Sequence, residues 1–176
     1  DELNGGAGND VLAGRMGSDI LNGGMGSDWA DYSGSLVGVT VNLTGAVQSG
    51  SAVHGNHAYG DTLISIENVY GSYFNDTITG DDGDNILDGL NGADTLNGGN
   101  GNDTAEYRYS NAAVTVNLAT NTHSGGDAAG DNLISIENLI GSAYNDSLTG
   151  SVGDNMLDGG TGNDTISGGA GNDWLV

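Results

Sequence analysis

Aspartate recurs at intervals of nine residues in three stretches of this chain, each time at the end of a glycine-rich turn. The pattern is clearest at Asp10, Asp19 and Asp28, and similar arrays of nonapeptides begin at residues 71 and 141. Carboxylates and backbone carbonyls are the hard ligands that Ca²⁺ accepts in irregular shells of about 6–8 oxygens, whereas Mg²⁺ prefers an octahedron that retains water. The chemistry that this spacing supports is therefore the binding of a divalent cation, with Ca²⁺ preferred.

The sixth residue of each nonapeptide is the candidate side-chain ligand. It follows a turn of ideal form G-G-x-G-x-D, whose glycines permit positive φ and leave carbonyl oxygens exposed. Eleven complete nonapeptides are present, and an incomplete copy precedes them. The candidate ligands are Asp1, Asp10, Asp19, Asp28, Asp76, Asn85, Asp94, Asp103, Asp146, Asn155, Asp164 and Asp173.

One apolar residue, at the eighth position, recurs with the same spacing, as in Leu12, Leu21 and Leu96. A single apolar residue in nine does not match the period of a helix, but it suits a strand of about three residues with its middle side chain turned inward. One such strand buries too little surface to be stable alone, whereas stacked copies share a continuous apolar stripe. We therefore expect a solenoid of short strands.

The composition excludes several classes of protein and calls for a counter-ion. The chain has 34 Gly among 176 residues, 24 acidic residues, two basic residues and no Cys, and its net charge is −22. It therefore lacks the basic surface that binds nucleic acid, the thiols for disulfides or thiolate metal sites, and any run of about 18 apolar residues that could span a bilayer. Stacked turns place like charges in a row, so we expect folding to depend on bound cations.

The nonapeptides resemble the RTX (repeats-in-toxin) consensus GGxGxDxUx, in which U is an apolar residue. Residues 5–13, 159–167 and 168–176 match all of its defined positions. The resemblance implies an all-β fold, a right-handed parallel β-roll or β-solenoid of short strands with calcium-binding glycine-rich turns. In that fold two nonapeptides form one coil, and each Ca²⁺ lies between one turn and the turn two further on.

Carried onto this sequence, the family pattern pairs ligands that are 18 residues apart. The pairs are Asp1 with Asp19, Asp10 with Asp28, Asp76 with Asp94, Asn85 with Asp103, Asp146 with Asp164, and Asn155 with Asp173. The carbonyl oxygens expected to complete the shells belong to turn glycines, namely Gly6, Gly8, Gly24, Gly26, Gly99, Gly101, Gly160, Gly162, Gly169 and Gly171. Six pairs predict six Ca²⁺ ions, and sites across the segments between the arrays would raise the number to about nine.

Four turns depart from the consensus, at matching places in the second and third arrays. Phe74 and Tyr144 replace the third glycine in the first nonapeptide of each array. The next nonapeptide carries Asn85 or Asn155 in place of the aspartate. An amide offers an oxygen but lacks the charge of a carboxylate, so we expect weaker sites at these turns.

Two segments without nonapeptides, residues 32–70 and 107–140, separate the arrays. Each contains the motif V-T-V-N-L and a later S-I-E-N motif, and both motifs are typical of short strands. We prefer wider coils of the same solenoid over separate domains, with the loops at 44–60 and 119–130 projecting outward.

On this interpretation residues 1–176 form one continuous solenoid that begins in mid-repeat. An array at 1–31 is followed by two copies of one module, at 32–106 and 107–176, and each copy consists of wider coils and then an array.

Other candidate chemistry has less support. His54, His57 and His123 lack the three or four convergent ligands that zinc needs, so we interpret them as exposed loop residues. Glu67 and Glu137 occupy equivalent places in repeated coils, which favours a structural or Ca²⁺-binding role over a catalytic pair. We find no nucleophile–base arrangement or phosphate loop and expect no enzymatic activity. Seven Tyr and two Trp leave open a surface for glycans.

The resemblance implies a calcium-binding structural module of a large secreted or cell-surface bacterial protein, of adhesin or surface-layer type. Type I secretion would export it unfolded, and extracellular Ca²⁺ would fold it. Two alternatives stay open: an accessory module of a secreted protease, lipase or alginate epimerase, and a filament unit that associates head to tail. The expected partners are calcium ions, without nucleic acid or membrane insertion, and a glycan or other cell-surface ligand is left open.

Overall fold

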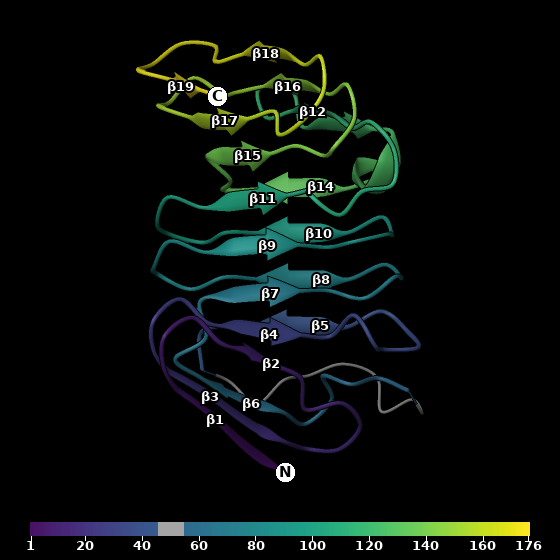
Figure 1. Ribbon diagram of the computed structural model, residues 1–176, viewed down its shortest axis with the longest axis vertical. Coiled ribbons are helices and arrows are strands. Elements are labelled where there is room, and N and C mark those ends of the chain that lie inside the picture. The colour runs from purple at the N-terminus through teal and green to yellow at the C-terminus, as the bar shows by residue number, and fades with distance from the viewer. Residues whose placement is uncertain (46–54) are drawn as a thin grey trace.

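Short strands stacked one above another make up almost all of the regular structure. The computed structural model describes residues 1–45 and 55–176. These residues form strands, mostly of three residues, and one 3₁₀ turn, η1 (Gly126–Ala128). Within this described part no helix is long and apolar enough to cross a membrane. The stack rises along the long axis of the molecule from the N-terminus to the C-terminus (Figure 1).

One side of the stack is a single sheet of eight strands, all paired in parallel. Within the arrays, paired residues are 18 positions apart, as for Val11 and Trp29, so each coil consumes two nonapeptides. In spatial order the strands are β2 (Val11–Leu12), β4 (Trp29–Asp31), β7 (Asn68–Tyr70), β9 (Ile86–Asp88), β11 (Thr104–Glu106), β15 (Asn138–Ile140), β17 (Met156–Asp158) and β19 (Trp174–Leu175).

The other side of the stack is divided into three smaller sheets. The first contains β1 (Glu2–Ala7), β3 (Ile20–Met25) and β6 (Thr62–Ile64). The second contains β5 (Thr40–Asn42), β8 (Thr77–Thr79), β10 (Thr95–Asn97) and β14 (Asn132–Ile134). The third contains β12 (Thr115–Asn117), β13 (Thr122–Ser124), β16 (Ser147–Thr149) and β18 (Thr165–Ser167). The described strands therefore form a parallel β-roll, in which β12 and β13 are the single antiparallel pair.

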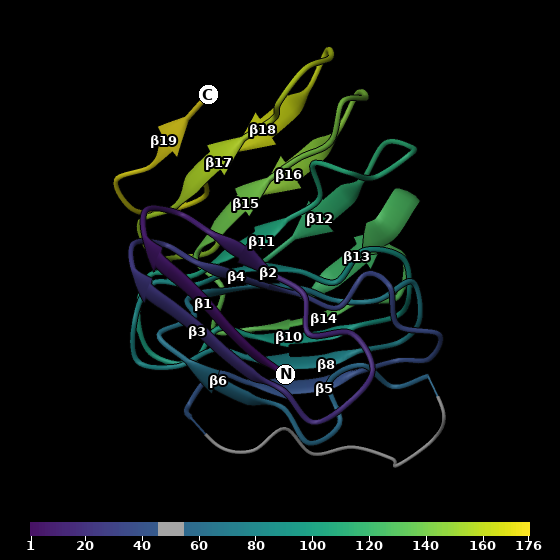
Figure 2. The ribbon, with the colours of Figure 1, turned by 60° about the horizontal axis from the view of Figure 1, so that its bottom comes forward.

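Each segment between arrays adds at least two described strands to one side of the roll and one strand to the other, and the second segment adds β13 as well. In the first segment β5 pairs with the following β8 and β6 with the preceding β3, while β7 joins the eight-stranded sheet. In the second segment β12, β14 and β15 repeat this arrangement. The unequal additions break the second side into three sheets, and the strands of the first and third arrays are inclined to those of the middle array (Figure 2). The strands of both segments thus lie in the same sheets as the nonapeptide strands.

A stripe of apolar side chains runs through the middle of the roll. The central residues of the nonapeptide strands, such as Leu21 and Leu96, are completely buried. Val41 and Val116 fill the same place in the strands that begin each module. At the C-terminal coil the stripe is uncovered, and Leu175 is 46% exposed. The prediction of an inward eighth residue is therefore confirmed along the stack, up to the last coil.

The two loops expected to project outward have different outcomes. Residues 46–54 of the first loop lie outside the described residues. In the second loop, β13 pairs with β12, and η1 buries Ala128 completely, with Asp127 N–H donating to Ser110 Oγ (3.1 Å). Most residues of this loop are exposed, as expected of an outward loop, and the exception is η1, where Asp127 and Ala128 are buried.

Truncating a central leucine should cost much more stability than truncating the same residue type at the open end. We expect Leu96→Ala to lower the free energy of unfolding by about 2–5 kcal/mol, because it leaves a cavity in the stripe. Leu175→Ala, the matched control, should change it by about 0.5 kcal/mol or less. Urea unfolding in buffer containing Ca²⁺ measures both, and equal losses would contradict a continuous core.

Candidate metal centre

Every strand of the eight-stranded sheet is preceded by a polar side chain, and these side chains stack along one side of the roll. They are Asp10, Asp28, Glu67, Asn85, Asp103, Glu137, Asn155 and Asp173. Most neighbours are joined by a repeated hydrogen bond from a backbone N–H to a side-chain oxygen. The Asp10 N–H donates to Asp28 Oδ1 (2.8 Å), and the Asn85 N–H donates to Asp103 Oδ1 in the same way (2.8 Å). We call this row the first ladder.

A second ladder follows the strands of the other side. The Asp76 N–H donates to Asp94 Oδ1 (2.8 Å), and the Asp146 N–H donates to Asp164 Oδ1 (2.9 Å). The structure brings together the members of all six expected pairs, including Asn155 with Asp173 and, through the Asp1 amino nitrogen and Asp19 Oδ1 (2.5 Å), Asp1 with Asp19. The Asp1 side chain itself is 89% exposed.

The second oxygen of these carboxylates shows whether a cation fits. The Oδ2 atoms of Asp10, Asp19, Asp28, Asp94 and Asp103 are buried and have no hydrogen-bond partner. A buried acceptor without a donor costs about 1–3 kcal/mol, and a charged one costs more. The chain has two basic side chains in all, so it cannot neutralise these oxygens itself. A bound cation would neutralise them.

Backbone oxygens converge on the same points. A Cβ atom built on Gly23 would lie 2.5 Å from Asp28 Oδ2 and 2.2 Å from the carbonyl oxygen of Ser65 in the next coil. At Gly98 the corresponding distances, to Asp103 Oδ2 and the Ser135 carbonyl, are both 2.3 Å. The first glycine of the nonapeptide therefore leaves space in which a carboxylate and a carbonyl face each other without a donor. The donor set fits a hard cation such as Ca²⁺.

The glycines expected to offer carbonyl oxygens all have positive φ, between 78° and 146°. At Gly26 a Cβ atom would lie 1.9 Å from the Gly8 carbonyl oxygen of the preceding coil, and at Gly101 it would lie 2.4 Å from the Gly83 carbonyl oxygen. These turns approach so closely that only glycine fits. The role of their oxygens as ligands stays a prediction.

Side chains alone do not form a metal centre. In residues 1–45 and 55–176, no three His, Cys, Asp or Glu side chains gather at one point. His57 and His123 are half-buried, so their interpretation as exposed residues is wrong, and His54 lies outside the described residues. The His123 Nε2 atom is hydrogen-bonded to Asn121 Oδ1 (2.6 Å), and burial lowers the pKa of the ring. Backbone oxygens must therefore supply most ligands.

In two of the turns that depart from the consensus, a serine of the same turn donates hydrogen bonds to the aspartate carboxylate. The Ser72 N–H donates to Asp76 Oδ2 (2.5 Å), and the Ser72 hydroxyl donates to Asp76 Oδ1 (2.8 Å). Ser142 makes the same two bonds to Asp146. These hydrogen bonds supply the donors that the other aspartates lack, which gives a physical reason for the expected weaker sites.

In the two asparagine turns, the side-chain amide forms hydrogen bonds with backbone groups of its own turn and of a neighbouring coil. The Asn85 Oδ1 atom accepts from the Asp81 N–H (2.8 Å), and its Nδ2 donates to the carbonyl oxygen of Glu67 (2.8 Å). Asn155 has an equivalent donor contact to the Glu137 carbonyl (2.6 Å). An N–H donor thus bridges two coils at the place where a carboxylate would need an ion.

Sequence reasoning missed two aspartates of the second ladder. Asp61 accepts from the Asp19 N–H (2.9 Å) and from the Tyr32 hydroxyl (3.3 Å). Asp131 accepts from the Asp94 N–H (2.9 Å) and from the buried Tyr107 hydroxyl (3.0 Å). The signal was present, because each aspartate stands two residues before a buried leucine, as in the nonapeptides.

Glu67 and Glu137 extend the first ladder across the segments between the arrays. Glu67 Oε2 accepts from the Asp28 N–H and Glu137 Oε2 from the Asp103 N–H, both at 2.9 Å. Only six residues separate Asp61 from Glu67, where the arrays use nine. The longer glutamate side chain spans the gap left by the shorter turn. These contacts are structural, and a role of the glutamates as Ca²⁺ ligands stays a prediction.

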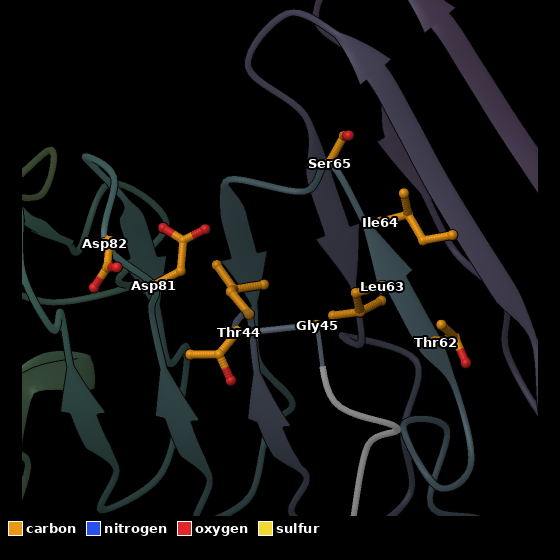
Figure 3. A pocket seen from close by; sticks show the side chains of 9 residues that line it. Thr44, Gly45, Thr62, Leu63, Ile64, Ser65, Asp81 and Asp82 are labelled. Carbon is orange, nitrogen blue, oxygen red and sulfur yellow. The ribbon is translucent and has the colours of Figure 1, made fainter.

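A cavity of about 530 Å³ opens beside β6 and the turn that carries Asp81 and Asp82 (Figure 3). Both carboxylates already have donors. Asp81 Oδ1 accepts from the Gly83 N–H (2.8 Å), and Asp82 Oδ1 accepts from Asn100 Nδ2 (2.8 Å). The cavity therefore differs from the ladder turns, because neither carboxylate lacks a donor.

Burial raises the pKa of ladder carboxyls in the chain without metal. Desolvation is the main cause at Asp94, whose pKa rises to about 8, and repulsion from Asp131 and Asp76 adds to it. Desolvation likewise raises the pKa of Asp103 and that of Asp76 to about 6. Without a counter-ion, burial therefore makes these side chains harder to ionise than free aspartate.

Comparison with known families gives one match. The model of the RTX calcium-binding nonapeptide repeat (four copies) matches residues 1–30, 70–105 and 140–175, which are more than half of the chain. No curated protein matches the chain. The matched residues are the three arrays, and the two segments between them lie outside the match.

In metal-free buffer, acid should stabilise the fold. The pKa values of Asp94, Asp103 and Asp76 are higher in the folded chain than the ordinary value near 4. Their contribution to stability is therefore complete below about pH 4 and is lost as the pH rises through about 6 and then 8. Circular dichroism of metal-stripped protein should show strand signal increasing from about pH 9 to about pH 5. Strand signal that decreases over this range would contradict the burial of uncompensated carboxyls.

Proposed function

The chain belongs to the RTX calcium-binding nonapeptide repeat family, and we propose that it is a structural module of a secreted or cell-surface bacterial protein, folded by extracellular Ca²⁺. In this proposal it is a binding and folding module and not an enzyme. The observation that supports it most directly is the set of five buried Oδ2 atoms without donors in the two ladders.

The proposed mechanism is a balance between carboxylate hydration and calcium binding. In the unfolded chain water solvates the aspartates, whereas folding without metal buries their oxygens unpaired and adds repulsion along each ladder. Six divalent ions would add +12 to the net charge of −22. Because Ca²⁺ binds the folded chain and not the separated turns, it stabilises the fold by mass action.

This balance suits folding after export. Sites of the extracellular class have dissociation constants of about 10⁻⁴–10⁻³ M, a range that cytosolic Ca²⁺ does not reach. The chain would stay unfolded in the cytosol and fold outside the cell. The proposal assigns ions first to the turns of Asp10, Asp19, Asp28, Asp94 and Asp103, whose oxygens lack donors.

A calcium titration of one ladder variant tests this proposal. Asp28→Ala removes one charge at a turn with an unpartnered Oδ2 and offers no amide donor in its place, and we expect the Ca²⁺ concentration at half-folding to rise about tenfold, or about 1.4 kcal/mol. Asp82→Ala removes the same charge from an exposed side chain and should shift the midpoint by about twofold or less. Circular dichroism during addition of Ca²⁺ and back-titration with EGTA follows both variants.

Two results would defeat the proposal. One is strand signal in the parent chain that EGTA leaves unchanged at neutral pH. The other is an equal shift in the two variants, which would mean that only total charge matters.

The asparagine turn offers a reciprocal test. Asn85→Asp replaces the amide donor to the Glu67 carbonyl with a second acceptor, so this turn should acquire a need for a cation. We expect calorimetry to find one more bound Ca²⁺ than in the parent and the folding transition to move to higher Ca²⁺ concentration. An unchanged stoichiometry would show that the amide does not replace an ion.

A further inference from the structure

A pocket on the outer surface, away from the ladders, is lined by aromatic rings. It has a volume of about 390 Å³, and its lining residues are Asp31, Ser33, Tyr70, Tyr73, Leu90 and Tyr109. Tyr70 and Tyr73 are close in the chain, and Tyr109 comes from a later coil. Tyr73 is 59% exposed and Tyr109 is 62% exposed. Three rings are thus held around one solvent-accessible space.

The rings are arranged as adjacent walls. Tyr70 stacks on Trp29, with centroids 4.0 Å apart and an interplanar angle of 15°. Tyr109 stands nearly perpendicular to Tyr70, at 5.9 Å and 72°. The stack on Trp29 fixes Tyr70 in place, and Tyr73 adds a third ring. Rings that meet at a corner in this way can surround a compact group rather than support a flat one.

The charges around the pocket favour a cation. Neither arginine of the chain lines it, and Arg108 is held by Glu106 (2.7 Å). Asp31 offers a carboxylate, of which Oδ1 accepts from the Ser33 N–H (2.9 Å). Burial raises the pKa of Tyr70, and the Tyr109 hydroxyl and the charges of Glu106 and Asp88 raise it further. The faces of aromatic rings attract cations, and this attraction strengthens when the cation is desolvated.

The second module contains the same pocket without the rings. Its volume is about 280 Å³, and Arg108, Ile140, Ala143 and Gly160 stand where the first module has Ser33, Tyr70, Tyr73 and Leu90. The fold therefore does not require the rings. Leu90 also has a φ of 61°, a strained value for leucine, at a position where the second module has glycine. The first pocket thus keeps residues that neither packing nor the turn demands.

We propose that the pocket of Asp31, Tyr70, Tyr73 and Tyr109 binds a quaternary ammonium group, such as that of choline. The rings would contact the methyl groups, and the Asp31 carboxylate would balance the charge. A neutral sugar could contact the rings but would gain nothing from the acidic surroundings. This site is independent of the calcium ladders, so the module would carry a ligand as well as fold.

Tryptophan fluorescence tests the proposal in the folded chain at saturating Ca²⁺. Trp174→Phe leaves Trp29, which stacks on Tyr70, as the single tryptophan. Choline should change its emission saturably, and Tyr73→Ala and Tyr109→Ala should each weaken binding about fivefold or more. Tyr144→Ala, at an exposed tyrosine outside the pocket, is the control and should leave the affinity unchanged. Circular dichroism confirms that each variant is folded.

Related ligands distinguish a cation site from an apolar or sugar site. The neutral isostere 3,3-dimethylbutanol should bind about tenfold more weakly than choline. Phosphocholine should also bind more weakly, because the chain repels its phosphate. Equal binding of the isostere, tighter binding of a methyl glucoside, tighter binding of phosphocholine, or an equal loss in Tyr144→Ala would each overturn the proposal. So would the absence of a saturable response to choline.

Discussion

The structure depends on one interaction, a carboxylate folded back over a glycine turn with one oxygen bonded to the neighbouring coil and the other left without a donor. The Oδ1 atom of Asp28 or Asp103 fixes the register of two coils through a backbone N–H. The Oδ2 atom of the same residue faces a carbonyl oxygen across the space that the first glycine leaves. Without a cation, this arrangement lowers the stability of the fold, because the buried oxygen is unpaired. A hard cation between the oxygens would replace their repulsion with attraction. The glycine turns, the acidic side chains and the short strands of the chain all take part in this arrangement.

The segments between the arrays solve the same problem without metal. The Tyr32 and Tyr107 hydroxyls donate to Asp61 and Asp131, and serine donors satisfy the aspartates of the first turns. Each module thus joins coils whose ladder residues have protein donors to coils whose ladder residues do not. The proposed dependence on Ca²⁺ would therefore be uneven along the stack and greatest at the ladder turns whose oxygens lack donors.

Duplication preserved the inner residues of the module and changed the outer ones. Tyr32 and Tyr107, or Val41 and Val116, occupy matching buried positions, where a change would leave a cavity or an unpaired carboxyl. On the surface, by contrast, Tyr70 of one module corresponds to Ile140 of the other. A solenoid of this kind offers a repeated frame whose outer positions are free to acquire separate binding properties.

The nine-residue spacing by itself determined the parallel stack, the inward eighth residue and the neighbours in the ladders, because identical short units bury their apolar faces only by stacking in register. Tertiary structure alone decided which ladder residues have donors from another coil. Tyr107 and the Asn85 amide reach their partners through the stacking of coils, and no local pattern reports which donor will lie opposite. It also decided that each segment between arrays adds more strands to one side than to the other, and that Tyr109 shares a pocket with Tyr70 and Tyr73. These features depend on how coils of unequal length pack, which is a property of the whole stack.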